Sequence, residues 1–208
     1  MYIFSIEFDG WSTILLRLNW FALLIFASLA GLALFAFRYR KQQLNKRVIT
    51  VDESNLGIGS NTMQITCTKR DRDIAYDLWV ELSTRQIGDR FDADTDVLTD
   101  VFESWSEFAS VARTTMSSIA ALKASSSSQL IIMTEQMLNK SLRPQLAKWQ
   151  TKYNKWYQDA AAENKAMTPQ ELQKTYPEYD QLLSDVVKTN QHMINFKDLM
   201  KQISFEQK

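Results

Sequence analysis

The longest apolar run of the chain lies near its start, from Trp20 to Phe37, where eighteen residues carry no charge. An α-helix rises about 1.5 Å per residue, so a helix of this length measures roughly 27 Å, close to the hydrocarbon thickness of a bilayer. Because it would be apolar on every face, we predict a transmembrane helix in place of a buried core helix. Leu15, Leu16 and Leu18 would extend it outward, and Arg17 can reach the head groups.

Charges on the two sides of this run predict its orientation. Glu7 and Asp9 precede it, whereas the residues that follow it are basic, with no acid among them: Arg38, Arg40, Lys41, Lys46 and Arg47. By the positive-inside rule the N-terminus lies outside and the C-terminal bulk is cytoplasmic. We expect these five basic residues to contact anionic lipid at the membrane surface.

Two further features of the run bear on its role. It lacks the basic N-terminal region and the small-residue cleavage site of a signal peptide, so we expect it to be retained as a single-pass anchor. Ala27 and Gly31 stand four residues apart, a spacing that favours close helix–helix contact between two copies in a membrane.

The apolar period changes to two after the basic stretch. Ile49 and Val51 alternate with polar residues, Met63, Ile65 and Cys67 do the same, and glycines lie between the two segments. This pattern predicts a short β-hairpin over residues 48–70. An extended linker is the alternative, because an isolated two-stranded hairpin is marginally stable unless it packs on helices or joins a partner's sheet.

From Asp71 onward the period is helical. Amphipathic segments are predicted over residues 71–88, with Gly88 as the C-terminal cap, and over 95–122, 128–162 and 178–203. Residues 123–129 should interrupt or bend the helical structure, and Pro144 should kink or split the third segment. The sequence "TPQE" at 168–171 is a capping box that starts a further helix, and Pro177 restarts it.

These segments together predict a mainly α protein. Residues 1–47 form the tail, the transmembrane helix and the basic stretch, residues 48–70 the hairpin or linker, and residues 71–208 a cytoplasmic antiparallel bundle of about four long helices. The sequence contains no fixed repeat, so a helical solenoid is the weaker alternative. The composition agrees, because only five glycines and three prolines occur among 208 residues.

The chain offers little material for catalysis. It has one cysteine, Cys67, which suits a reducing compartment, and one histidine, His192, which we expect at a polar surface or boundary. This pair is too small for a zinc site, and no phosphate-binding glycine loop or nucleophile elbow occurs. We therefore expect no enzymatic activity, no metal and no cofactor.

One segment, "DADTDVLTDVFE" from Asp92 to Glu103, has the spacing of an EF-hand calcium loop. Its sixth place, however, is Val97, where the loop needs the sharp turn that glycine makes, and no second loop occurs. We expect instead that Asp94, Thr95 or Asp96 caps a continuous helix, so that calcium is not a partner. A weak surface cation site made by Asp92, Asp94 and Asp96 is the remaining alternative.

Charge is regional although the 24 basic and 24 acidic residues balance. Residues 90–107 carry six acids against one base, whereas residues 140–155 carry only bases, and the two segments could face each other. Aromatic residues between these bases fall at core spacing, so nucleic acid is not the expected partner. The residues that we expect to contact a protein partner are Asp92, Asp94, Asp96, Lys148, Lys152 and Lys155.

Several stretches, among them "IAYDLWVELSTRQIG", "LRPQLAKWQTKYNKWY" and "YPEYDQLL", resemble a loose set of small bacterial proteins with one N-terminal span and a helical cytoplasmic domain. The resemblance covers roughly residues 12 to 205 and rests on packing and capping signals, so no functional residue is carried over. It implies a bacterial inner-membrane protein that is not an enzyme, with anti-phage defence as its setting.

The function expected from the sequence is that of a membrane-anchored interaction or adaptor protein, which presents its helical domain to a protein partner or to itself. An alternative is an effector that oligomerises through its transmembrane helix and damages the membrane. A membrane-tethered nucleic-acid binder and a calcium sensor are two weaker hypotheses.

Overall fold

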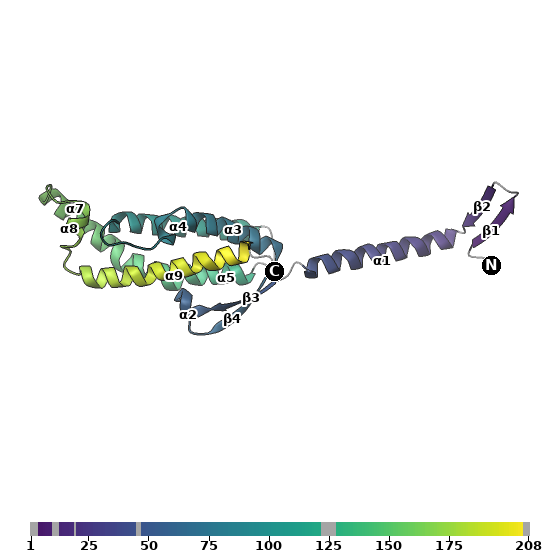
Figure 1. Ribbon diagram of the computed structural model, residues 1–208, viewed down its shortest axis with the longest axis horizontal. Helices are drawn as coiled ribbons and strands as arrows, with labels where there is room; N and C mark the ends of the chain where they lie inside the picture. The colour runs from purple at the N-terminus through teal and green to yellow at the C-terminus, as the bar shows by residue number, and fades with distance from the viewer. Residues whose placement is uncertain (1–3, 10–12, 19, 45–46, 122–127, 206–208) are drawn as a thin grey trace. The chain divides into compact units, whose positions relative to one another are not determined.

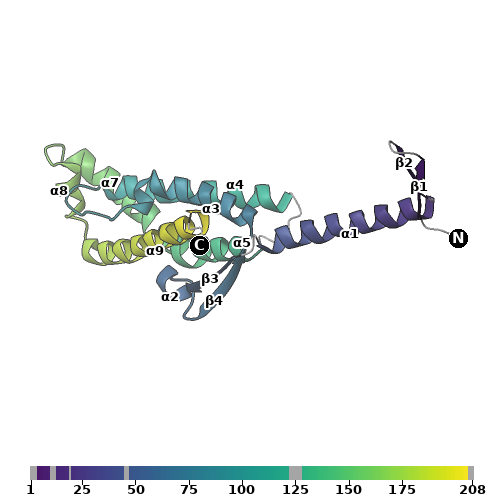
Figure 2. The same ribbon diagram turned by 45° about the vertical axis from the view of Figure 1, so that its right-hand side comes forward.

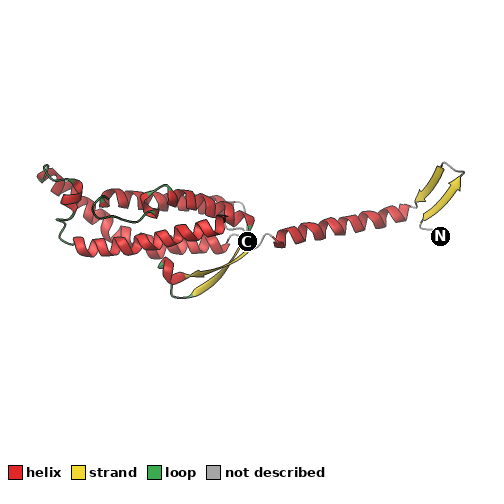
Figure 3. Cartoon of the chain, viewed as in Figure 1, coloured by secondary structure: helices red, strands yellow, loops and turns green. Residues whose placement is uncertain are grey.

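The structure, a computed structural model, describes residues 4–9, 13–18, 20–44, 47–121 and 128–205 (Figure 1). The chain is mainly helical, at 77%, and divides into two compact units, Met1–Lys46 and Arg47–Lys208. Figure 3 distinguishes the helices from two pairs of strands, one pair in each unit. The two units are described separately below.

The first unit begins with an antiparallel hairpin of β1 (Phe4–Asp9) and β2 (Thr13–Leu18), in which Phe4 lies opposite Leu18. The predicted outward extension of the apolar helix through Leu15, Leu16 and Leu18 is therefore wrong, because these residues belong to β2. The reason lies in β1, "FSIEFD", whose apolar and polar residues alternate and which pairs with β2 along its whole length.

Helix α1 (Trp20–Leu44) follows, and it continues past Phe37 to include Arg38, Arg40 and Lys41. Among the described residues it is the helix that is long and apolar enough to cross a membrane, over the window Leu23–Arg40. None of that window is buried inside the structure. A membrane span and a signal sequence both fit this helix.

The second unit begins with the hairpin that the sequence predicts, so the linker alternative is wrong. Strand β3 (Arg47–Asp52) pairs antiparallel with β4 (Thr62–Cys67), and Ile49, Val51, Ile65 and Cys67 are buried in the same core as the helices. Packing on helices stabilises this small sheet. The connection contains helix α2 (Glu53–Leu56), capped by Asp52, and Gly57, whose φ of 65° favours glycine.

Helix α3 (Lys69–Ser83) starts with a capping box between Thr68 and Asp71. The prediction that Gly88 caps its end is wrong, because Thr84 is the cap: its N–H and its hydroxyl both donate to the carbonyl of Val80. Gly88 lies in the 3₁₀ turn η1 (Gln86–Gly88), where a Cβ would stand 1.8 Å from the carbonyl oxygen of Leu82. Close backbone approach therefore explains this glycine.

Helix α4 (Leu98–Ala121) has the predicted apolar face, of which Phe102, Trp105 and Phe108 are fully buried. The predicted cap at Asp94, Thr95 or Asp96 is wrong. The first N–H of the helix, that of Leu98, donates to Oε1 of Gln173 at 3.0 Å, so a residue distant in sequence satisfies it. The predicted break at 123–129 falls mostly on residues 122–127, which lie outside the described residues.

A helical run then extends from residue 128 to residue 163 without interruption. It consists of α5 (Ser128–Gln136), the π-helical η3 (Met137–Leu142), α6 (Arg143–Gln145), the π-helical η4 (Leu146–Gln150) and α7 (Thr151–Glu163). Pro144 therefore does not split the segment. It lies between two π-helical stretches, whose wider turns accommodate a residue that has no backbone donor.

Helix α8 (Pro169–Gln173) has the predicted capping box, with Thr168 and Glu171 bonded reciprocally, and α9 (Tyr179–Phe205) follows Pro177. Helices α3, α4, α5 and α9 lie side by side, as the views in Figures 1 and 2 agree. Their facing apolar side chains form one core with the hairpin. The largest fully buried side chains include those of Phe102, Trp105, Phe108, Trp149, Tyr153 and Phe196.

Gln173 is a fully buried polar residue that joins α8 to the start of α4. Besides accepting from Leu98, its Nε2 donates to the carbonyl of Asp96 at 2.9 Å. We expect Gln173→Leu to lower the free energy of unfolding by about 1–3 kcal/mol, because it leaves buried backbone groups unpaired. Urea unfolding measures the change. Gln170→Leu, which removes one exposed bond to Thr95, is the matched control, and an equal effect of both substitutions would contradict this role.

Candidate interaction surfaces

The three predicted basic contact residues are all paired within the second unit. Nζ of Lys148 lies 2.7 Å from Oδ2 of Asp185, Lys152 pairs with Glu178, and Lys155 lies 2.8 Å from Asp159. These are partly or largely exposed ion pairs, which contribute little to stability. A partner can bind these lysines only by displacing the acidic residue with which each of them is paired.

The predicted acidic contact residues lie together in the loop before α4. Asp94 lies 2.7 Å from Nζ of Lys174, which lowers the pKa of its carboxyl group. Oδ1 of Asp92 accepts from the N–H of Asp94, and Oδ2 of Asp96 accepts from the N–H of Asp92. In the described part of the chain, no three carboxylate, histidine or cysteine side chains converge as a metal site would need. That calcium is not a partner stays a prediction.

The two charged segments face each other through uncharged side chains, because Phe102 packs edge-on against Tyr153 and Ser106 exchanges hydrogen bonds with Gln150. Among the described residues, however, no ion pair joins the charges of one segment to those of the other. The described ion pairs join Lys148 to α9 and Asp94 to Lys174, beside α8, while Glu107 of α4 pairs with Arg85. The aromatics of the basic segment are core residues, since Trp149 and Tyr153 are buried and Nε1 of Trp149 donates to Asp185 at 2.9 Å. These two rings are therefore not exposed for stacking on bases. The expectation that nucleic acid is not a partner stays a prediction.

The predicted membrane-surface residues divide between the two units. Arg38, Arg40 and Lys41 belong to α1, and Lys46 lies outside the described residues. Arg47 begins β3, is partly buried, and donates from Nη1 to the carbonyl of Gln202 at 3.4 Å. It is therefore a residue of the folded domain as well as of the basic stretch.

His192 lies at a boundary, as the sequence predicts, and its Nδ1 is 3.0 Å from Oγ of Ser141. Burial disfavours the imidazolium and lowers the pKa of His192 below 6.5, and the nearby charge of Lys188 lowers it further. The unfolded chain therefore binds this proton at higher pH than the folded domain. Neutral His192 therefore favours the folded domain fully above about pH 6.5, and this contribution to the free energy of unfolding decreases as the pH falls toward the lower pKa of the folded state.

We accordingly expect the domain to lose stability on acidification below pH 6.5 in part through His192. Urea unfolding at a series of pH values between 7.5 and 5 measures the slope. In His192→Gln, which keeps a polar side chain that does not titrate, the slope should be smaller over this interval. An unchanged slope would show that other groups cause the dependence.

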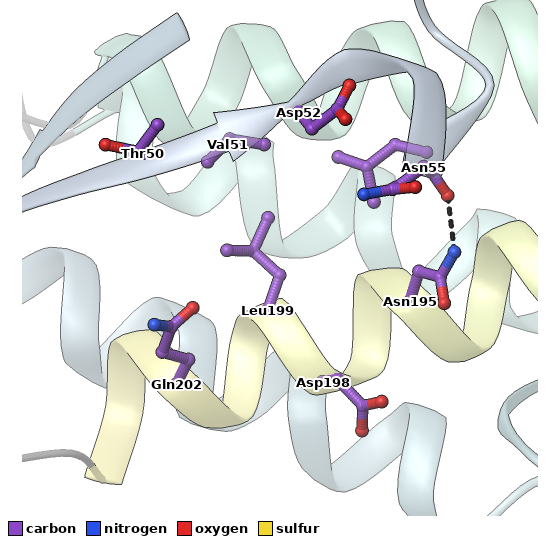
Figure 4. A pocket seen from close by; sticks show the side chains of 9 residues that line it. Thr50, Val51, Asp52, Asn55, Asn195, Asp198, Leu199 and Gln202 are labelled. Atoms are coloured by element: carbon purple, nitrogen blue, oxygen red, sulfur yellow. Dashed lines mark hydrogen bonds between the residues drawn. The ribbon is translucent and has the colours of Figure 1, made fainter. Parts of the chain in front are cut away.

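A polar groove lies between β3 and α9 (Figure 4). It has a volume of about 480 Å³, within the range of ligand pockets. Leu199 points up toward Val51, and the carboxylates of Asp52 and Asp198 lie at the two outer rims of the groove, one on the β3 side and one on the α9 side. The lining consists of Thr50, Val51, Asp52, Asn55, Leu56, Asn195, Asp198, Leu199 and Gln202.

A second groove, of about 400 Å³, lies between α4 and the helical run that begins at residue 128. Arg113, Arg143 and Glu135 border it, and Met116, Leu138 and Leu146 give it an apolar wall. Its mixed charge indicates no single ligand chemistry. The groove beside β3 has the more definite character, because the charged residues of its lining, Asp52 and Asp198, are both acidic.

Comparison of the chain with protein-family models, with curated proteins and with solved structures finds no match. The candidate surfaces therefore rest on the residues themselves. Sequence reasoning missed the groove, although the alternation of "RVITVD" indicates one exposed side of β3. Which helix lies beside that strand cannot be read from the pattern.

Proposed function

We propose that this protein is a single-pass membrane adaptor, with its N-terminus outside and the domain of residues 47–208 in the cytoplasm. The observation that carries the proposal is α1, an apolar helix that is exposed along the whole window Leu23–Arg40 and ends in basic residues. In water such an apolar surface would be strongly unfavourable, and in a bilayer it is not. The basic end then lies on the cytoplasmic side.

The domain attached to this anchor has features suited to binding. We propose that its long helices form an antiparallel bundle of about four, and that the bundle serves as a rigid support for the surfaces described above. The proposed activity is recognition of a protein partner at the membrane surface, without catalysis or a cofactor. Its proposed setting is a bacterial inner membrane, with anti-phage defence as the process served.

The test of the anchor has two readouts on the native full-length protein. Mass spectrometry of the mature protein should find peptides from Trp20–Leu44, because a signal sequence would have been removed. Protease added to right-side-out vesicles should spare the C-terminal domain, and opening the vesicles should expose it. A mature protein that lacks α1, or a domain digested from outside, would overturn this topology.

Oligomerisation through α1 is the second candidate, favoured by the open surface around Gly31, where an added Cβ would have no heavy atom within 4 Å. With Ala27 it forms a small-residue pair that suits close packing of two helices in lipid. A membrane-damaging effector of this kind predicts toxicity on overproduction that Gly31→Leu abolishes and Leu34→Ala does not. Toxicity unchanged by Gly31→Leu would exclude this route.

A further inference from the structure

The two edges of the β3–β4 hairpin differ in how their backbone groups are used. On the β4 edge, the N–H of Thr66 donates to Oε1 of Gln129 on α5 at 2.8 Å, so this donor points away from β3. In an antiparallel ladder, opposite residues alternate between pairs that bond to each other and pairs whose groups point outward. Thr66 lies opposite Val48. The N–H and C=O of Val48 therefore point outward from β3.

The same alternation places the N–H and C=O of Thr50 on the outer edge, because it repeats every second residue. A hydrogen bond within the ladder agrees with this assignment: the N–H of Glu53 donates to the carbonyl of Asn61 at 2.9 Å. The backbone groups of Glu53 therefore point inward, and those of the residues at even positions before it, Thr50 among them, point outward. Within the described part of the chain, no hydrogen bond joins the backbone of Val48 or Thr50 to another element. One edge of the sheet is thus covered by α5 and the other is open.

The groove described above lies along this open edge. Its far wall is α9, and hydrogen bonds cross between the walls near both ends, from Arg47 to the carbonyl of Gln202 and from Asn195 to the carbonyl of Asn55 at 2.7 Å (Figure 4). Asn195 and Gln202 lie seven residues apart on α9, or about 10 Å along the helix, which corresponds to about three residues of extended chain. The chemistry of the lining is acidic and amide, from Asp52, Asp198 and the neighbouring Asn and Gln residues.

We propose that a partner protein places an extended segment rich in lysine or arginine in this groove, where it adds a strand to β3. The proposal rests on the adaptor function and specifies the chemistry of its partner. Backbone hydrogen bonds to Val48 and Thr50 hold the segment, and alternate side chains reach the groove. The carboxylates of Asp52 and Asp198 select basic side chains by charge complementarity.

A second copy of this chain fits the edge less well. If β3 paired antiparallel with its own copy about Thr50, Asp52 would lie opposite Val48 of the second copy, and Arg47, the base of that strand, would lie opposite Glu53 and not opposite Asp52. A basic segment pairs both acids. Charge therefore favours a partner over self-pairing, and the experiment below distinguishes the two.

The experiment uses full-length protein in lipid nanodiscs and a phage-displayed library of random ten-residue peptides as the probe. Selected peptides should carry lysine or arginine at alternate positions and lack proline in the central part. Thr50→Pro removes an outward N–H that the β3–β4 ladder does not use, so the hairpin keeps its own bonds. Its affinity for the selected peptides should fall by about tenfold or more, whereas Gln64→Pro, which removes the outward N–H of the opposite residue on the β4 edge, should bind normally.

A second variant, Asp52→Asn with Asp198→Asn, tests the charge. Asparagine still accepts the N–H of Ser54, so the cap of α2 is retained while the negative charge is lost. We expect weaker binding and a smaller dependence of affinity on salt concentration. Circular dichroism and thermal unfolding of each variant verify that the domain remains folded.

Three results would overturn the groove assignment: equal binding to Thr50→Pro, selected peptides without basic residues, or self-association of the wild-type protein that Thr50→Pro abolishes. The adaptor function fails separately. If a native partner co-purifies equally with wild type and with Thr50→Pro, the protein is an adaptor, but its partner does not bind in this groove. If basic peptides bind as expected and no native protein co-purifies, the groove stands as a peptide site and the adaptor function fails.

Discussion

Replacing Phe108 by alanine is expected to lower the free energy of unfolding of the domain by about 3–5 kcal/mol. The ring is fully buried on α4, in the core shared by the helices and the hairpin. Its removal costs the transfer free energy of the ring together with that of the cavity left behind. Since domains of this size are stable by about 5–15 kcal/mol, much of the total would be lost.

Urea unfolding of the fragment of residues 47–208, followed by circular dichroism, measures this effect, because the fragment is a compact unit of its own. The matched control is Val187→Ala, since Val187 is 49% exposed on α9. That substitution should change stability by no more than about 0.5 kcal/mol. A small effect of Phe108→Ala would mean that α4 does not pack as described.

If α1 spans a membrane as proposed, two charges within it are expected to release the protein from that membrane. Leu29 and Leu32 are exposed in the middle of the apolar window, and Leu29→Asp with Leu32→Asp should disfavour insertion by about 5–7 kcal/mol in total. Basic residues attract the protein to an anionic membrane surface by about 1 kcal/mol each. The three basic residues that belong to α1, Arg38, Arg40 and Lys41, would therefore contribute about 3 kcal/mol, which is less than the cost of the two aspartates.

The readout is the fraction of protein that stays in the membrane pellet after a carbonate wash. Wild type should stay almost entirely in the pellet, and the double aspartate variant should move to the supernatant. Leu29→Ala with Leu32→Ala is the control, because it changes the same positions and keeps the helix apolar. Retention of the aspartate variant would contradict the assignment of α1 as a membrane span.

The helices were predictable wherever a local pattern fixes them. Phe102, Trp105 and Phe108 recur at three-residue spacing, and Thr168 and Glu171 form a cap within four residues, so neither feature depends on the rest of the chain. The alternation of "FSIEFD" was equally local. It was missed because the stronger apolar run beside it favoured an extended helix.

Other features depend on residues far apart in the sequence. Leu98 is capped by Gln173, and no pattern around either residue indicates that contact. The open edge of β3 follows from the bond between Thr66 and Gln129, which lie 63 residues apart and fix the phase of the ladder. The acidic residues of the groove likewise come from β3 and α9, which are far apart in the sequence. A pattern within one segment could therefore not predict the candidate site.

Recognition of a protein partner by the membrane-anchored domain, as proposed above, can be tested by purifying the full-length protein from its native membranes in detergent and determining the composition and mass of the complex. We expect one protein partner in fixed stoichiometry, detected by mass spectrometry and by light scattering after size exclusion. A homo-oligomer or a monomer without a partner would be inconsistent with an adaptor, and the homo-oligomer would favour the effector that assembles through Gly31.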